Sequence, residues 1–440
     1  MLRTLPIWIA ALTLSGCSSA IPSQTSDPPF FGAARSAATI AHPLPSAADA
    51  AAPAALGTLL QDVDDDAPPT FSYPEHWRQH GVDHAALPEL LLARGFEPGV
   101  TFRAFVLEIT FSPTLPVVIG ERAFDWDDTS ARIWGWNPGS TVKVFAAAAA
   151  LSRLHQQGFT PDAVATFRGR QEETWSMTEI IHDAITKSGN MSYNRLVQLA
   201  GYDWLNEHFF DERSGPAASA INGAYEISNW RRRGESKDLS FAPAIAVQEG
   251  ERLWEREPAQ GVSTPRCAGS ACTHLQDLAE VMRRIGLHER LPPEQRLLLG
   301  DPEIALLRQA LAAQRKRGME AVDALRAGYG RGDLFLMHKP GFAENWFSDL
   351  IYLEDREAHS AWVIVLAARR GRNGLDQGAR ILGEVLANGE LALAEHRPGL
   401  RSETLKSLQV QATPEERRAV RQNKKQRAKK KSVAPKKKKR

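Results

Sequence analysis

The residues of this chain that could do covalent chemistry begin with a serine and a lysine three positions apart. Ser140 and Lys143 directly follow a Pro-Gly turn, and Ser140 is the only serine followed by lysine at this spacing. At i and i+3 of a helix, two side chains share one face with Cβ atoms about 5–6 Å apart. Removal from water lowers the pKa of a lysine, and a neutral amine can take the proton of a neighbouring hydroxyl. The pair therefore predicts a serine nucleophile activated by lysine.

The element that must position this pair is a buried helix. No Gly or Pro occurs from Ser140 to Gln157, and Gly158 follows as a C-terminal stop. The stretch is apolar on nearly every side, which is typical of a helix in the middle of a domain. We therefore expect Ser140 in the first turn of a central helix.

Two further groups of polar residues lie at the ends of other expected elements. Ser188-Gly189-Asn190 follows a helix expected over 178–186, and a helix from Arg195 to Ala200 comes next, ending at Gly201. Lys339-Pro340-Gly341 follows a strand expected over 333–338. Each group alone is a weak signal.

Strands gather at the two ends of the sequence, with helices between them. The N-terminal strands, 102–111 and 117–120, read as a hairpin, and the strands 333–338, 346–353 and 361–368 read as an antiparallel meander. The remaining expected helices are 87–92, 275–285, 303–315 and 378–386. This order predicts an α+β fold, in which N- and C-terminal segments build one antiparallel sheet and a helical region is inserted.

Taken in order, the three groups resemble the motif set of a known superfamily. Ser140-x-x-Lys143, Ser188-x-Asn190 and Lys339-Pro340-Gly341 are similar to the S-x-x-K, S-D-N and K-T-G motifs of the penicillin-recognising serine hydrolases, which include class A β-lactamases and D,D-peptidases. The resemblance covers about residues 100–390 and implies a β-lactamase/transpeptidase-like fold. It also implies hydrolysis of an amide, a β-lactam or a peptide-like substrate, without a cofactor or a metal.

The resemblance implies four catalytic residues. Ser140 Oγ would attack the acyl carbonyl and form an acyl-enzyme, and Lys143 would accept or relay its proton. Ser188 and Lys339 would pass a proton to the leaving nitrogen. The alternative function is an inactive or slow relative that binds cell-wall material in the same cleft.

The resemblance also implies three substrate-binding residues. Asn190 would hydrogen-bond the acyl side chain, and Gly341 and Phe342 would line the substrate. The backbone N–H groups of Ser140 and Phe342 would form the oxyanion hole. A second register, Ser192-Tyr193-Asn194, also fits the middle motif; we favour Ser188 because the preceding helix runs straight into it.

The sequence departs from the family pattern in two places. Pro340 stands where the family has Thr or Ser, and no Arg or Lys lies on the strand 346–353 to bind a substrate carboxylate. Class A β-lactamases also carry a loop Glu with Asn four residues later, which activates the deacylating water. Within 201–264 the nearest pair is Glu226 and Asn229, at a spacing of three. We therefore expect slow deacylation, which favours a peptidase, a transacylase or an esterase.

The N-terminus has the pattern of a bacterial lipoprotein signal. Arg3 precedes a short apolar run from Leu5 to Leu14, and Leu14-Ser15-Gly16-Cys17 resembles a lipobox. The run is too short to span a bilayer. We expect cleavage after residue 16, lipidation of Cys17 and anchoring at the periplasmic side of the cell envelope. An ordinary signal peptide is the alternative, and it also predicts export.

Composition divides the rest of the chain. Residues 17–70 are rich in Ala, Pro and Ser and read as a flexible tether; 71–398 read as the hydrolase domain and 399–440 as a basic tail. Residues 411–440 hold 14 Lys/Arg and 2 Glu, so the first 410 residues carry a net −10 against the total of +2. Outside the cytoplasm, such a tail favours anionic envelope components over nucleic acid; a solvated tail without a partner is the alternative.

Two cysteines remain after Cys17. Cys267 and Cys272 are separated by small residues, and in an oxidising compartment this spacing predicts a local disulfide. The residue that could join them in a metal site is His274, which is too few ligands, so we predict no metal.

Overall fold

The computed structural model of the protein describes residues 81–98, 102–127, 136–211, 213–235, 238–265, 270–313, 320–331, 333–369, 372–400 and 402–403. The expected signal peptide, Cys17, the tether and almost all of the basic tail lie outside these residues. The domain limits given above therefore stay predictions.

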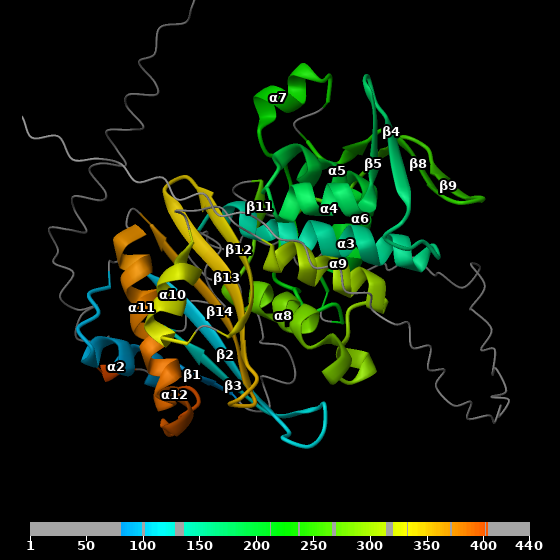
Figure 1. Ribbon diagram of the computed structural model, residues 1–440. Coiled ribbons are helices and arrows are strands. Elements are labelled where there is room, and N and C mark those ends of the chain that lie inside the picture. Colours follow the sequence, from blue (N-terminus) through cyan, green and yellow to red (C-terminus); the bar gives the residue numbers. More distant parts are fainter. Residues whose placement is uncertain are drawn as a thin grey trace, which may run out of the picture. The chain divides into compact units, whose positions relative to one another are not determined.

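A six-stranded sheet joins the two ends of the folded chain (Figure 1). Its strands, in spatial order, are β1 (Val82–Asp83), β3 (Val118–Asp125), β2 (Arg103–Phe111), β14 (Ser360–Arg369), β13 (Trp346–Asp355) and β12 (Phe335–Ala343). Every neighbouring pair is antiparallel except β1 and β3. N-terminal β2 lies directly against C-terminal β14, which confirms the expected α+β architecture.

The sheet has two apolar faces because its strands alternate. On β2, Phe105, Leu107 and Ile109 join one core, whereas Ala104 and Val106 join the other. The second core is covered by α2 (Ala86–Ala93), α10 (Ala321–Tyr329), α11 (Arg372–Ala387) and α12 (Glu390–Leu393). The first core continues into the inserted helical region.

The helical region is built around α3. Its elements are η1 (Gly139–Val142), α3 (Lys143–Gln156), α4 (Met177–Ile185), α5 (Asn190–Ala200), α6 (Tyr202–Trp204), the π-helix η2 (Leu205–Phe209), α7 (Ile227–Arg232), α8 (Leu275–Gly286), η3 (His288–Arg290), η4 (Pro293–Gln295) and α9 (Asp301–Ala312). Every α3 residue from Lys143 to Ser152 is buried, which confirms the central helix. No helix within the described ranges has both the length and the apolar content needed to cross a bilayer.

Helix α8 differs from its expected environment. Its amphipathic sequence predicts one solvent face, yet every residue from Leu275 to Ile285 is buried. The polar side is buried through pairing: Arg283 Nε lies 2.6 Å from Glu121 Oε1, and Arg284 Nε lies 2.6 Å from Glu280 Oε1. An amphipathic pattern marks two different faces, but it does not show whether the polar face meets water or other charges.

Besides β1, eight strands in the described part of the chain lie outside the expected ones. Four form a second antiparallel sheet in the order β5 (Glu172–Ser176), β4 (Val164–Arg168), β8 (Ala244–Glu249) and β9 (Arg252–Arg256). The others pair as β7 (Phe241–Ala242) with β10 (Ala259–Gln260) and β6 (Ala220–Ile221) with β11 (Ala271–Cys272). These strands are short, and the edge strands β5 and β9 expose much of their length. Short, exposed strands lack the alternation of apolar and polar residues from which a strand can be predicted.

Candidate active site

The turn that carries Ser140 is a single 3₁₀ turn leading into α3. Gly139 has a positive φ of 57°, a conformation that favours glycine. Gly139 N donates to Asn137 Oδ1 at 3.0 Å, and Thr141 Oγ1 donates to Pro138 O at 2.9 Å, so side chains on both sides hold the turn. The Ser140 side chain is half-buried at the start of this turn.

Strand β12 packs its backbone directly on this turn, and two glycines permit the contact. A Cβ on Gly139 would lie 2.6 Å from Phe342 N, and a Cβ on Gly341 would lie 2.3 Å from Pro138 O. The backbone around Ser140 and the amide of Phe342 are therefore neighbours, as an oxyanion hole requires. The Phe342 side chain is 50% exposed and lies at the outer side of this contact.

Two buried lysines meet at the hydroxyl of Ser188. Lys339 Nζ donates to Ser188 Oγ at 2.9 Å, and Lys143 Nζ lies 3.3 Å from the same oxygen. Lys143 Nζ also donates to the backbone oxygen of Ser188 and to Asn190 Oδ1, the latter at 2.7 Å. Both lysine side chains are fully buried. The three sequence groups thus meet in one hydrogen-bonded cluster. The first group contributes Lys143, the second contributes Ser188 and Asn190, and the third contributes Lys339.

The geometry favours Ser188 over Ser192 as the middle serine. Ser188 has a φ of 60°, and α5 begins two residues later at Asn190 rather than at Arg195 as expected. Ser192 is fully buried within α5, and its Oγ donates to Asp183 Oδ2 at 2.8 Å. Its hydroxyl therefore supports the helix and does not reach the lysines.

Pro340 lies in the edge strand of the sheet, which explains how the strand tolerates a residue without an N–H. The residues opposite Pro340 and Gly341 on β13 are Asp349 and Ser348. Asp349 contacts His338 at 3.2 Å, and Ser348 Oγ donates to Pro138 O at 3.2 Å. Neither cross-strand neighbour supplies a positive charge for a substrate carboxylate.

Sequence analysis did not identify Tyr225 as part of this cluster. Its hydroxyl donates to Gly139 O at 2.7 Å, and its ring stacks on Tyr193 and lies 5.9 Å from Lys143 Nζ. Burial raises the pKa of Tyr225, so the hydroxyl stays a neutral donor. Asn194 holds the backbone of Tyr225 in place, with its Nδ2 donating to Tyr225 O at 3.0 Å and its Oδ1 accepting from Tyr225 N at 2.9 Å.

Glu226, the nearest sequence match to the family's loop carboxylate, lies beside Asn190. It adopts the left-handed conformation (φ 55°, ψ 47°) and accepts a long hydrogen bond of 3.5 Å from Asn190 Nδ2. Asn229 Nδ2 donates to its other oxygen. Because Asn190 also binds Lys143, Glu226 is one residue away from the lysine. The spacing of three between Glu226 and Asn229 differs from the family's spacing of four. The left-handed backbone of Glu226 directs its side chain toward Asn190, and no sequence pattern indicates this conformation.

The loop that carries Glu226 is also anchored at its far end. Arg195 is fully buried on α5; its Nη2 donates to Glu235 Oε1 at 2.9 Å and its Nε to Glu173 Oε2 at 3.2 Å. Its guanidinium lies 4.7 Å from the centre of the Trp230 ring. The loop from Tyr225 to Glu235 is thus held on both sides by residues of α5.

The predicted disulfide and the histidine near it do not belong to this cluster. Cys272 is in a disulfide, whereas Cys267 lies outside the described residues. His274 is buried, and burial lowers its pKa to about 3. In the described part of the chain, no group of three or more His, Cys, Asp and Glu side chains is arranged to hold a metal ion.

No protein-family model matches the chain, and no curated protein matches its sequence. Solved structures that match include a β-lactamase from Burkholderia vietnamiensis (12% identity, TM-score 0.46, covering 71% of this chain and 98% of that one). A class A β-lactamase from Mycobacterium abscessus matches at 15% identity and a TM-score of 0.44, over 69% and 99% of the two chains. PBP-A matches at 15% identity and a TM-score of 0.43, over 70% and 98%.

Proposed function

We propose that this protein is a serine hydrolase that forms an acyl-enzyme on Ser140 with an amide or β-lactam substrate. The observation that carries the proposal is the Ser188 hydroxyl, which lies between Lys143 Nζ and Lys339 Nζ beside the Ser140 turn. Two buried amines and a half-buried hydroxyl that can exchange protons, near the half-buried hydroxyl of Ser140 at a helix start, match the needs of nucleophilic acyl transfer.

In the proposed acylation, the Ser140 hydroxyl gives its proton to the neutral amine of Lys143, and Ser140 Oγ forms a bond to the acyl carbon. The oxygen of the tetrahedral intermediate accepts from the amides of Ser140 and Phe342. When the carbon–nitrogen bond breaks, Ser188 Oγ gives its proton to the leaving nitrogen. Lys339 Nζ, 2.9 Å away, then restores the proton of Ser188.

In the proposed deacylation, Glu226 takes a proton from water as the water attacks the ester carbon. Its hydrogen bonds from Asn190 and Asn229 orient the carboxylate, and Asn190 links it to Lys143. When the bond between Ser140 Oγ and the acyl carbon breaks, Glu226 gives this proton to Ser140 Oγ. Lys143 then passes the proton it took during acylation through Ser188 Oγ to Lys339, which restores both lysines. The position of Glu226 therefore favours hydrolysis over permanent acylation.

We propose that the acyl donor is not selected through a carboxylate on its leaving side. Pro340 offers no hydroxyl, and the cross-strand neighbours Asp349 and Ser348 offer no cation. The exposed ring of Phe342, whose centre lies 4.8 Å from that of Phe347, offers apolar contact instead. Neutral esters and amides with apolar groups fit this edge better than dianionic substrates.

The test is mass spectrometry of the protein, first intact and then after proteolytic digestion, following incubation with penicillin G or with an uncharged phenylacetyl thioester. We expect a mass increase on the peptide that contains Ser140, with the thioester reacting faster. Ser140→Ala should abolish the adduct, and Ser192→Ala, a serine outside the cluster, should keep it. The proposal fails if neither donor labels the wild type above Ser140→Ala.

One observation favours a second function, binding without catalysis. Ser140 Oγ makes no hydrogen bond to any described residue, while Lys143 donates to Ser188 and Asn190. A chain of this kind would bind cell-wall material in the cleft, with help from the basic tail. Pull-down by cell walls that survives Ser140→Ala but is lost on deletion of residues 411–440 would support it.

We also propose that the protein is exported and anchored by a lipid on Cys17, on the strength of the lipobox-like sequence. The basic tail would bind anionic envelope components. Labelling with radioactive palmitate should mark the wild type and not Cys17→Ser. Equal labelling of both would exclude Cys17 as the lipidated residue.

A further inference from the structure

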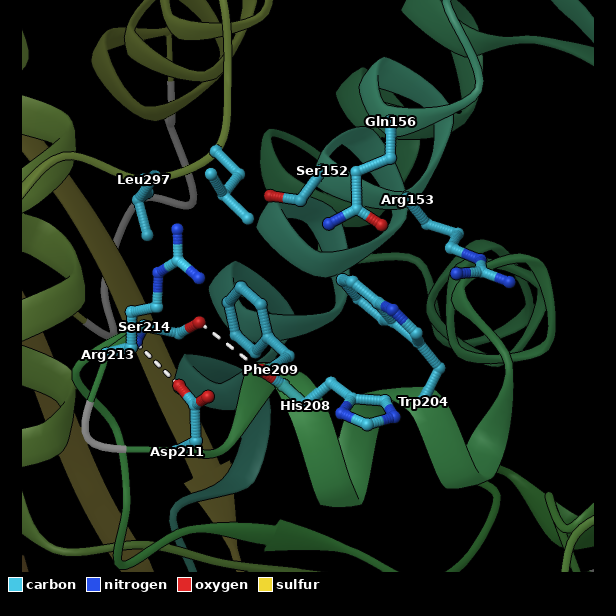
Figure 2. Close-up of a pocket in the computed structure, with 11 residues that line it drawn as sticks. Ser152, Arg153, Gln156, Trp204, His208, Phe209, Asp211, Arg213, Ser214 and Leu297 are labelled. Atoms are coloured by element: carbon cyan, nitrogen blue, oxygen red, sulfur yellow. Dashed lines mark hydrogen bonds between the residues drawn. The ribbon is translucent and has the colours of Figure 1, made fainter. Parts of the chain in front are cut away.

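A second cavity lies at the opposite end of α3 from Ser140. It has a volume of about 370 Å³ and is formed by the last two turns of α3, by α6 and η2, by Asp211, Arg213 and Ser214, and by Leu297 and Leu298 (Figure 2). Helix α3 has 14 residues and rises about 1.5 Å per residue, so about 20 Å separate its two ends. The cavity is therefore separate from the candidate active site.

Several hydrogen-bonding side chains of this cavity have no partner among the described residues. Ser152 is 2% exposed, its oxygen points into the cavity in Figure 2, and it makes no hydrogen bond to the described residues. Gln156 and Arg213 are exposed residues of the lining, and their side chains make no hydrogen bond or ion pair to the described residues either. Unused donors around one cavity indicate a place for an external acceptor.

A hydrogen bond between Asp211 and Ser214 flanks Arg213, which lines the cavity. Asp211 Oδ1 accepts from Ser214 N at 2.6 Å, and Ser214 Oγ donates to His208 O at 3.3 Å. The carboxylate of Asp211 is thus used to hold the turn and forms no ion pair with Arg213. In Figure 2 the Arg213 guanidinium points toward the side of the cavity where Ser152 and Leu297 lie.

Arg153, which lines the cavity, lies close to a second arginine, Arg256. Arg153 lies 5.5 Å from the centre of the Trp204 ring, and its Nε is buried without a hydrogen-bond partner. Arg256 is close enough that Arg153, after burial, contributes to lowering its pKa to about 10. Arg256 donates to the backbone oxygens of Gln198 and Leu199 and not to a carboxylate. An anion entering the cavity would reduce this repulsion.

The apolar part of the cavity is aromatic. Phe209 and Trp204 lie 6.4 Å apart between ring centres, and the leucines 297 and 298 lie on the other side. The π-helix places Phe209 and His208 at the cavity, and such irregular turns are frequent at functional sites. A flat apolar group could therefore pack on Phe209 while its polar end meets the donors.

We propose that this cavity binds a small organic carboxylate with a flat apolar body. The carboxylate would accept a bidentate pair of hydrogen bonds from the Arg213 guanidinium and further bonds from Ser152 and Gln156. The ring would lie on Phe209 beside Trp204. The volume matches that of sites for ligands of this size.

The test uses the full-length protein with 2-naphthoate as the probe and isothermal titration as the readout. We expect 2-naphthoate to bind at least about tenfold more tightly than 2-naphthamide, its uncharged analogue, since a hydrogen bond to a charged group is lost. Arg213→Gln should weaken naphthoate binding about tenfold or more. Ser140→Ala should leave it unchanged, because the two sites are separate.

Matched variants keep the test decisive. Arg170→Gln removes the same charge from an exposed position that does not line the cavity, and it should leave binding unchanged. Trp204→Leu should weaken both ligands. Equal affinity of Arg213→Gln and wild type, equal affinity for naphthoate and naphthamide, or no binding by the folded wild type would each overturn the proposal.

Discussion

The contact between Gly341 and the Ser140 turn offers a direct test of how this site works. In Gly341→Ala, the new Cβ would lie 2.3 Å from Pro138 O, 2.6 Å from Ser348 Oγ and 3.0 Å from Thr141 Cγ2. Pro138 O is a backbone atom and cannot rotate away. The substitution must therefore push β12 away from the turn, and with it the amide of Phe342.

The size of the effect follows from that distance. An ordinary contact with a Cβ begins near 3.4 Å, so β12 and the turn must separate by about 1 Å. A misplacement of about 1 Å can cost about 10²-fold in rate, and loss of one oxyanion donor costs about 10²- to 10³-fold. We therefore expect acylation of Ser140 to slow by about 10²-fold or more. Overpacking should also lower the free energy of unfolding by about 1–3 kcal/mol.

The assay measures the rate of acyl-enzyme formation at saturating acyl donor, together with urea unfolding. Gly374→Ala is the control, because a Cβ on Gly374 meets no atom within 4 Å, and it should keep the wild-type rate. Adding Ser348→Ala to Gly341→Ala should not restore the rate, since the contact with Pro138 O remains. The reasoning is refuted if folded Gly341→Ala acylates within about threefold of wild type, because a misplaced oxyanion donor costs far more.

Three further predictions concern other residues. Glu226→Gln should lengthen the lifetime of the acyl-enzyme by about 10²-fold or more without slowing its formation, and formation that slows equally would remove Glu226 from the deacylation step. Ser188→Ala should slow formation by about 10²- to 10⁴-fold, as measured by single-turnover kinetics, and a rate near wild type would show that the two lysines do not act through this hydroxyl. Burial raises the pKa of Asp277 to about 7, so the folded protein keeps a proton that the unfolded chain releases above about pH 4. The free energy of unfolding should therefore fall as the pH rises from about 4 to 7, by up to about 4 kcal/mol, and Asp277→Asn should remove that fall in urea titrations.

The sequence alone determined the architecture because its signals there are local and strong. An uninterrupted apolar stretch defines α3, and the apolar strands Arg103–Phe111 and Ser360–Arg369 define the middle of the sheet. The resemblance of the three motif groups placed Ser140, Ser188 and Lys339 in one site, although the groups are far apart in the chain. The structure brings the amines of Lys143 and Lys339 within hydrogen-bonding distance of the Ser188 hydroxyl.

Other features depended on the tertiary structure. The polar sequence around Tyr225 and Glu226 has no period, and only the clamp from Asn194 and the left-handed backbone of Glu226 bring the two residues to Lys143 and Asn190. The same holds for the cavity beside Phe209, whose lining comes from three separate stretches of the chain. Periodicity reports which side of an element is apolar, whereas the direction of a loop carboxylate depends on single backbone angles and on long-range hydrogen bonds. Those are set when the whole chain packs, so they leave no repeating pattern in the sequence.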